Sequence, residues 1–235
     1  LSIGNNLISY PYSSSLNQDI ENTSSSGLYG VAGEGYAAIA LPDGSWGGSL
    51  NTFESGRGYW FISNDDFEFS YGNPDRSGDN LTRTVIKQVR PKVPDAYRYT
   101  QSMNQQFFFI SDAKINGESL EEGDWIISYN DDVIVGARMW AGQYTDVPAM
   151  GYDASVGSDI MTAGYCEPGD VITFKVYDVS EDKLVNMDTP EFNTEWVGNN
   201  SMSVGSLEEE VLPTAIALGH AYPNPFNPST SISYD

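Results

Sequence analysis

The sequence predicts an all-β protein made of two small antiparallel β-sandwich-like modules in tandem. Short segments that alternate apolar and polar residues recur along the chain, separated by Gly, Ser, Asn and Pro. This is the pattern of half-buried strands between turns. No stretch of ten or more residues shows the 3.6-residue apolar period that a helix would require. Several short strands with turn signals between them favour antiparallel sandwiches.

Each expected strand is short and is bounded by turn-forming residues. In chain order the strands lie within residues 6–13 (NLISYPYS), 58–63 (GYWFIS), 67–72 (FEFSYG), 82–89 (TRTVIKQV), 124–140 (DWIISYNDDVIVGARMW, two strands) and 171–178 (VITFKVYD). In the last of these, Ile172, Phe174 and Val176 share one face. The turn inside 124–140 is Asn-Asp-Asp, residues that hydrogen-bond to their own backbone. One short helix is expected near residues 15–22 (SLNQDIEN).

Composition divides the chain into five parts. The second part carries six of the eleven basic residues, and the fourth is acidic and too poor in apolar groups to fold alone. The parts are an N-terminal β module (1–75), a basic connector (76–98), a second β-sandwich module (99–190), an acidic linker (191–219) and an extended tail (220–235).

The charge of the chain excludes some partners. Lys and Arg total 11 against 33 Asp and Glu, so the formal net charge is −22. Such a chain repels nucleic-acid phosphates and anionic membrane surfaces. No run of 18 apolar residues is present, so no membrane span is expected. Cys166 is the only cysteine, which excludes an internal disulfide.

The tail contains the stretch YPNPFNPSTSISY, residues 222–234. Its first seven residues are the candidate sorting motif, namely Tyr222, Pro223, Asn224, Pro225, Phe226, Asn227 and Pro228. Each proline fixes φ and removes a donor, so this segment is extended and stays out of a sheet. The stretch resembles the start of the C-terminal sorting domain of the bacterial type IX secretion system. The resemblance implies export, a location outside the cell or on its outer surface, and the secretion machinery as a partner. It also implies a truncated domain, because most of its strands would follow Asp235.

The two body modules resemble accessory modules found upstream of that sorting domain. The first carries NNLISYPYS and GSLNTFESGRGYW, and the second carries INGESLEEGDWIISYNDDVIVGARMWAG and TAGYCEPGDVITFKVYD. The resemblance covers most of residues 5–72 and 99–182. It implies no catalytic residues.

Few residues offer catalytic chemistry. His220 is the only histidine and lies in the tail, so a Ser-His-Asp triad and a His/Cys zinc site have no candidates. With 33 acids, paired carboxylates arise by chance, and an enzyme is the weakest interpretation. Calcium takes oxygen ligands, and the candidate ligands are Asp131, Asp132, Asp153 and Asp159. The alternative is that these residues form Asx turns.

Aromatic side chains in loop-like segments are the other candidate site. Trp46 lies in DGSWGGS, and Trp140 and Tyr144 flank AGQ. Trp and Tyr faces can stack on sugar rings, since the ring body is apolar and its edge is polar. The alternative is that these residues anchor their loops.

We therefore expect a non-catalytic module outside the cell or on its surface, acting in display, adhesion or assembly. The terminal STSISYD, residues 229–235, is expected to add a strand to a neighbouring copy. The alternative is a carbohydrate-binding accessory module of a secreted polysaccharide-degrading enzyme. No cofactor other than calcium is indicated.

Overall fold

The computed structural model describes residues 1–16, 27–71, 87–155 and 157–210. Strands are the main regular structure of these residues and helical segments are short, so the prediction of an all-β protein is confirmed. The sorting motif at 222–228 lies outside the described residues, as do most of the helix expected at 15–22 and of the strand expected at 82–89. Among the described residues, no helix is long and apolar enough to cross a membrane.

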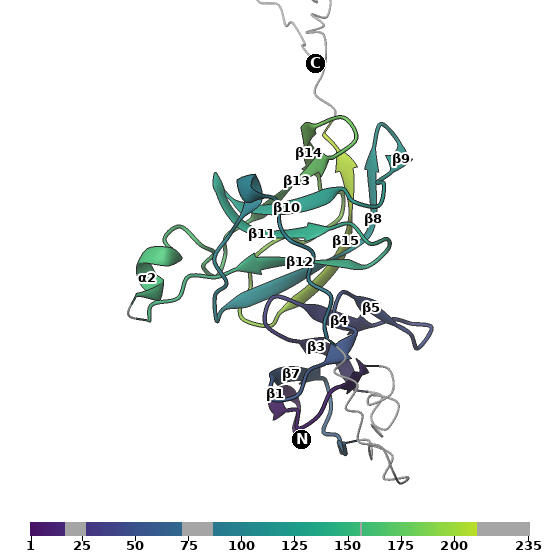
Figure 1. Cartoon of the computed structure of the whole chain (residues 1–235), viewed down its shortest axis with the longest axis vertical. Coiled ribbons are helices and arrows are strands. Elements are labelled where there is room, and N and C mark those ends of the chain that lie inside the picture. Colours follow the sequence, from purple (N-terminus) through teal and green to yellow (C-terminus); the bar gives the residue numbers. More distant parts are fainter. Residues whose placement is uncertain (17–26, 72–86, 156, 211–235) are drawn as a thin grey trace, which may run out of the picture.

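The first module contains a five-stranded antiparallel sheet (Figure 1) and a separate two-stranded ribbon. Its strands are β1 (Gly4–Ser9), β2 (Ser14–Ser15), β3 (Leu28–Ala32), β4 (Ala37–Ala40), β5 (Trp46–Gly48), β6 (Thr52–Phe53) and β7 (Gly58–Ser63). The sheet order is β1-β7-β3-β4-β5, and β2 pairs with β6. The strand expected at 58–63 is therefore present as β7, and the one expected at 6–13 is present as β1 over residues 6–9 only.

Aromatic rings fill the core of the first module. Tyr10 stacks on Phe53 at a centroid distance of 4.0 Å, and Phe61 packs edge-on against Phe69 at 5.0 Å. The prediction of a strand at 67–72 is wrong for its described residues 67–71, which form no strand. Phe67 and Phe69 still pack into this aromatic core. The alternation of apolar and polar residues here therefore reflects burial of every second side chain, without pairing in a sheet.

The second module is a larger sheet that follows the connector. Its strands are β8 (Gln105–Ile115), β9 (Glu118–Ser119), β10 (Trp125–Asn130), β11 (Val133–Met139), β12 (Thr145–Met150), β13 (Ile172–Asp178), β14 (Lys183–Asp188) and β15 (Met202–Glu209). The order is β11-β10-β13-β14-β15-β8-β12, with β9 paired to β8. All pairs are antiparallel except β15 with β8, which is parallel. A short helix, α2 (Ser158–Met161), lies on the loop between β12 and β13 (Figure 1).

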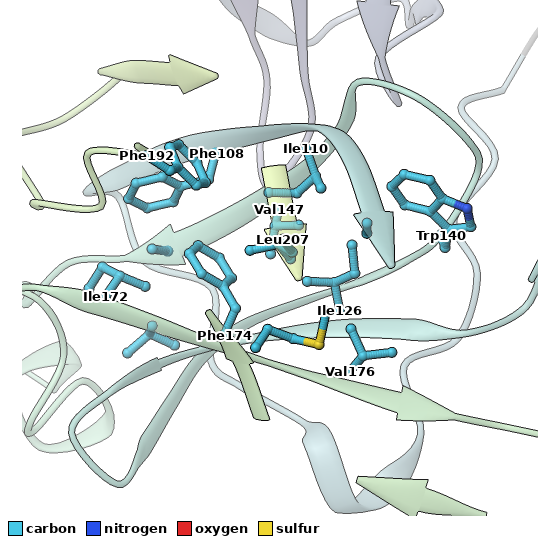
Figure 2. Close-up of a cluster of buried hydrophobic side chains, with 14 of the residues drawn as sticks. Phe108, Ile110, Ile126, Trp140, Val147, Ile172, Phe174, Val176, Phe192 and Leu207 are labelled. Carbon is cyan, nitrogen blue, oxygen red and sulfur yellow. The ribbon is translucent and has the colours of Figure 1, made fainter. Parts of the chain in front are cut away.

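This sheet curls until its two edge strands approach one another. A Cβ added to Gly136 in β11 would lie 1.8 Å from the carbonyl oxygen of Pro148 in β12. That oxygen also accepts a 2.7 Å hydrogen bond from the hydroxyl of Ser128 in β10. The curled sheet encloses the main core, in which Phe108, Phe174 and other apolar side chains converge from facing strands (Figure 2).

The expected hairpin and the expected strand at 171–178 are confirmed. Strands β10 and β11 pair antiparallel across the turn, where Asp131 has a φ of 49°. In β13, Ile172, Phe174 and Val176 are buried and the intervening residues are more exposed, as the alternation predicts.

The prediction of an acidic linker at 191–219 is wrong for residues 191–210. Strand β15 lies inside the sheet between β14 and β8, and Phe192, Trp196 and Leu207 belong to the main core. The segment does not have to fold alone, because the backbone groups of β15 pair with strands on both sides. Its polar composition therefore reflects exposed faces of a central strand.

The described part of the basic connector packs against both modules. Arg90 forms a 3.3 Å ion pair with Glu54 of the first module. Further along, Val93, Tyr97 and Tyr99 cover the face of β10 that points away from the main core. The single-turn 3-10 helix η1 (Asp95–Tyr97) lies within this covering segment.

Candidate ligand cleft at the module junction

A buried apolar cluster joins the two modules. Ala32, Ala37 and Ile62 of the first sheet pack with Phe107 and Phe109 of β8. Close approach is achieved where the first module has glycine. An added Cβ at Gly48 would meet the Phe109 ring at 3.0 Å, and one at Gly47 would meet Cβ of Tyr144 at 2.6 Å. The two modules therefore share a core, which differs from independent units on a linker.

Asp146 in β12 is the polar centre of this junction. Its side chain is fully buried, yet its carboxylate is surrounded by donors from the first module. The backbone N–H groups of Ala37 and Ser49 donate at 3.0 and 2.6 Å, and the Ser49 hydroxyl donates at 2.9 Å. Burial raises the pKa of Asp146, while Arg138 and these hydrogen bonds oppose that shift.

Arg138 in β11 pairs with this carboxylate. Its Nη2 lies 3.2 Å from Asp146 Oδ2, and its Nε donates at 2.8 Å to the Asp146 carbonyl. Nη2 also donates to the carbonyl of Gly35, which belongs to the first module. Burial opposes the charge on Arg138, but Asp146 and neighbouring tyrosines outweigh it and raise the pKa of Arg138. The hydrogen bonds of this buried ion pair thus come from both modules.

Two further residues complete the polar contact. Gln105 accepts a 2.9 Å hydrogen bond from Gly35 N–H and donates a 2.6 Å bond to the Gly33 carbonyl. The ring of Tyr36 lies against the guanidinium of Arg138, with its centroid 4.3 Å from Cζ, and Arg90 approaches the same ring at 5.3 Å.

A cleft of about 240 Å³ opens beside this network. Its walls come from both modules and from the connector, and junctions between modules are common places for ligand sites. Its polar lining includes Ser49, Asn51, Gln88, Gln143 and Thr145. Its apolar lining includes Val89, Pro91, Met139 and Ala141.

Tyr144 is the unusual residue of the cleft. Its φ of 62° lies in the left-handed region, which is unfavourable for a bulky side chain. The backbone is held there by a 2.7 Å hydrogen bond from Tyr144 N–H to the Ile110 carbonyl. Other non-glycine residues with positive φ in the described ranges are Asn, Asp or Glu, so Tyr144 is the one aromatic among them. Strain of this kind gathers at functional sites.

The charge balance of the cleft favours a neutral ligand. Arg138 and Asp146 are the charged residues in its lining, and they neutralise one another. The side-chain amide of Gln88 is already hydrogen-bonded within the cleft wall. Its nitrogen donates to the Ser49 carbonyl at 2.6 Å, and its oxygen accepts from Asn51 N–H at 3.2 Å. Within the described ranges, the amide of Gln143 and Nδ2 of Asn51 make no hydrogen bond to protein and remain available.

The structure separates the three aromatic residues proposed for stacking. Trp140 is only 6% exposed and belongs to the main core (Figure 2), so the prediction that it stacks on a ligand is wrong. Trp46 opens β5 and packs half-buried on the aromatic core of the first module. Tyr144 is the one of the three that lines the cleft.

The proposed calcium ligands do not come together. Asp131 and Asp132 are exposed at the β10–β11 turn. The carboxylate of Asp153 accepts from Ser155 N–H at 2.9 Å, and that of Asp159 accepts from Ile160 N–H at 2.9 Å. Hydrogen bonds from Ser155 lower the pKa of Asp153. No group of three or more His, Cys, Asp or Glu side chains suited to a metal occurs in the part of the chain that is described.

Several residues of the cleft were not singled out from the sequence, including Tyr36, Gln88, Arg138 and Asp146. The available signal was a charge inside each of two apolar segments, GARMW and TDVPAM. A charge in such a place is rarely buried without a partner. Comparison of the chain with protein-family models, with curated proteins and with solved structures gave no match.

Proposed function

We propose that the chain is a non-catalytic module of an exported bacterial protein, placed outside the cell or on its outer surface. Its role is display, adhesion or assembly. The observation that carries the proposal is the junction, where Asp146 and Arg138 bind backbone groups of the first module inside a shared core. Interfaces between domains that are large and apolar suppress relative motion. A stiff two-module unit suits a part that holds another domain at a fixed distance from a surface.

Secretion through the type IX system is supported by the tail resemblance at Tyr222–Pro228. The net charge of −22 fits a surface role, because it favours solubility and keeps the chain away from anionic lipid. The partner at that step is the secretion machinery, which would read the tail.

Labelling of intact cells of the source organism tests this proposal. Antibodies raised against residues 1–210 should bind whole cells, and protease added outside should remove the signal. A periplasmic marker protein should stay protected in the same sample. Labelling that appears only after the cells are lysed would refute the surface location.

A second function, carbohydrate binding, is favoured by one specific observation. Tyr144 lines a cleft whose polar groups are amides and hydroxyls and whose charges cancel. Sedimentation of the protein with insoluble polysaccharides tests it. Retention on at least one neutral polysaccharide is expected, and an unretained protein on all of them would contradict this function.

A further inference from the structure

The size of the junction cleft distinguishes two modes of sugar recognition. Flat rows of aromatic rings bind the middle of a polysaccharide chain, whereas a small pocket admits only an end or a single residue. Here the cavity measures about 240 Å³, below the roughly 300–1,000 Å³ typical of drug-sized pockets. It therefore has room for about one ring.

We propose that the junction cleft binds one neutral pyranose unit, either a free sugar or the terminal residue of a glycan. This inference rests on the second function above and names its site. Tyr144 supplies the aromatic surface, and the amide of Gln143 and Nδ2 of Asn51 supply hydrogen bonds to hydroxyl groups.

The backbone strain at Tyr144 supports the assignment. A left-handed conformation is unfavourable for most L-residues, and Asn or Gly would adopt it with less penalty. The described turns with positive φ mostly use these cheaper residues, for example Asn116 and Gly142. A tyrosine at this position therefore keeps an aromatic ring at the cleft at the expense of local stability.

Neutrality follows from the pairing at the base of the cleft. An acidic sugar would need an unpaired cation, but the guanidinium of Arg138 is engaged by Asp146, Gly35 and the Tyr36 ring. A basic ligand would need a free carboxylate, and that of Asp146 already accepts hydrogen bonds from Ala37 and Ser49.

The test measures binding of the methyl glycosides of glucose, galactose and mannose to the whole chain. Ligand-observed NMR and calorimetry detect that binding. At least one should bind. Gln143→Ala and Tyr144→Asn should each weaken that binding tenfold or more. Met103→Ala, at an exposed side chain outside the lining of the cleft, serves as the matched control and should bind normally. Because Asn tolerates positive φ, Tyr144→Asn should remain folded, which its unfolding curve will show.

The outcomes separate this inference from the function on which it rests. If a polysaccharide is retained but Tyr144→Asn retains it equally, the site is wrong and carbohydrate binding stands. If neither polysaccharide nor glycoside binds, both are wrong. Binding of glucuronate in preference to the neutral glycosides, or of an aromatic peptide instead, would also overturn the assignment.

Discussion

The carboxylate of Asp146 in the second module accepts two hydrogen bonds from Ser49 in the first, at 2.6 Å from its N–H and 2.9 Å from its hydroxyl. A buried carboxylate of one module is thus stabilised by hydrogen bonds from the backbone of the other. Neither module can bury its half of this contact alone, which makes the junction a part of the fold.

Replacement of Asp146 should strongly destabilise the protein. In Asp146→Ala, Arg138 is left buried without its counter-charge, which costs about 3–5 kcal/mol in comparable cases. Urea unfolding measures the change in free energy. The control is Asp112→Ala, which breaks the exposed 2.6 Å pair with Lys114 and should cost less than about 1 kcal/mol. Equal losses in the two variants would contradict the junction's role.

Gly136→Ala should be among the most damaging small substitutions in the chain. Its Cβ would lie 1.8 Å from a backbone oxygen of Pro148, which cannot rotate away. Overpacking of this kind costs about 3 kcal/mol. Thermal unfolding should show the loss. Gly58→Ala is the control, because its Cβ would meet the end of the Leu7 side chain at 3.3 Å and the Ile8 carbonyl oxygen at an ordinary 4.0 Å. A Gly136→Ala protein as stable as the control would argue against the curled sheet.

Cys166 should be unreactive in the folded protein. It is 1% exposed, and burial, helped by Asp170, raises the pKa of its thiol to about 12. Iodoacetamide at about pH 8 should leave the native protein unmodified and alkylate it in concentrated urea, which mass spectrometry detects. The folded state keeps this proton to higher pH than the unfolded state. Its contribution to stability is therefore full below the ordinary thiol pKa of 9.0 and is lost as the pH rises towards 12. Rapid native alkylation would refute this burial.

The strand-donation hypothesis predicts an assembly that depends on the tail. Light scattering after size exclusion should show a complex that becomes monomeric when residues 220–235 are removed. Strand β1 is an edge of its sheet, with Leu7 62% exposed, and is the acceptor we expect. Leu7→Lys should therefore also reduce assembly, since charge on an edge opposes pairing. A full chain that is monomeric would rule out donation.

The strands that could be predicted from the sequence are those in which apolar and polar residues alternate and which also pair within a sheet. Strand β13 shows it most clearly, since every second side chain enters the core. Strand β15 was not predicted, because Leu207 is its one fully buried side chain and its polar composition resembles that of a linker. Its pairing with β8 is a tertiary fact that local patterns do not contain.

The candidate site was harder to foresee for a related reason. Tyr144 was singled out from its loop-like surroundings, but Ser49 and Asp146 are 97 residues apart and meet only after both modules have formed. Local reasoning can mark a charge in an apolar segment as needing a partner. It cannot say that the partner is the backbone of another module.

The parallel pairing of β15 with β8 has a consequence for the order of events during synthesis. Residues 107 and 202 are register partners, so β8 lacks its partner on the β15 side until nearly the whole second module has been made. Such distant pairing slows folding, because a long loop must close before the contact forms. A chain that emerges from its N-terminus therefore keeps this sheet open until its last strand arrives.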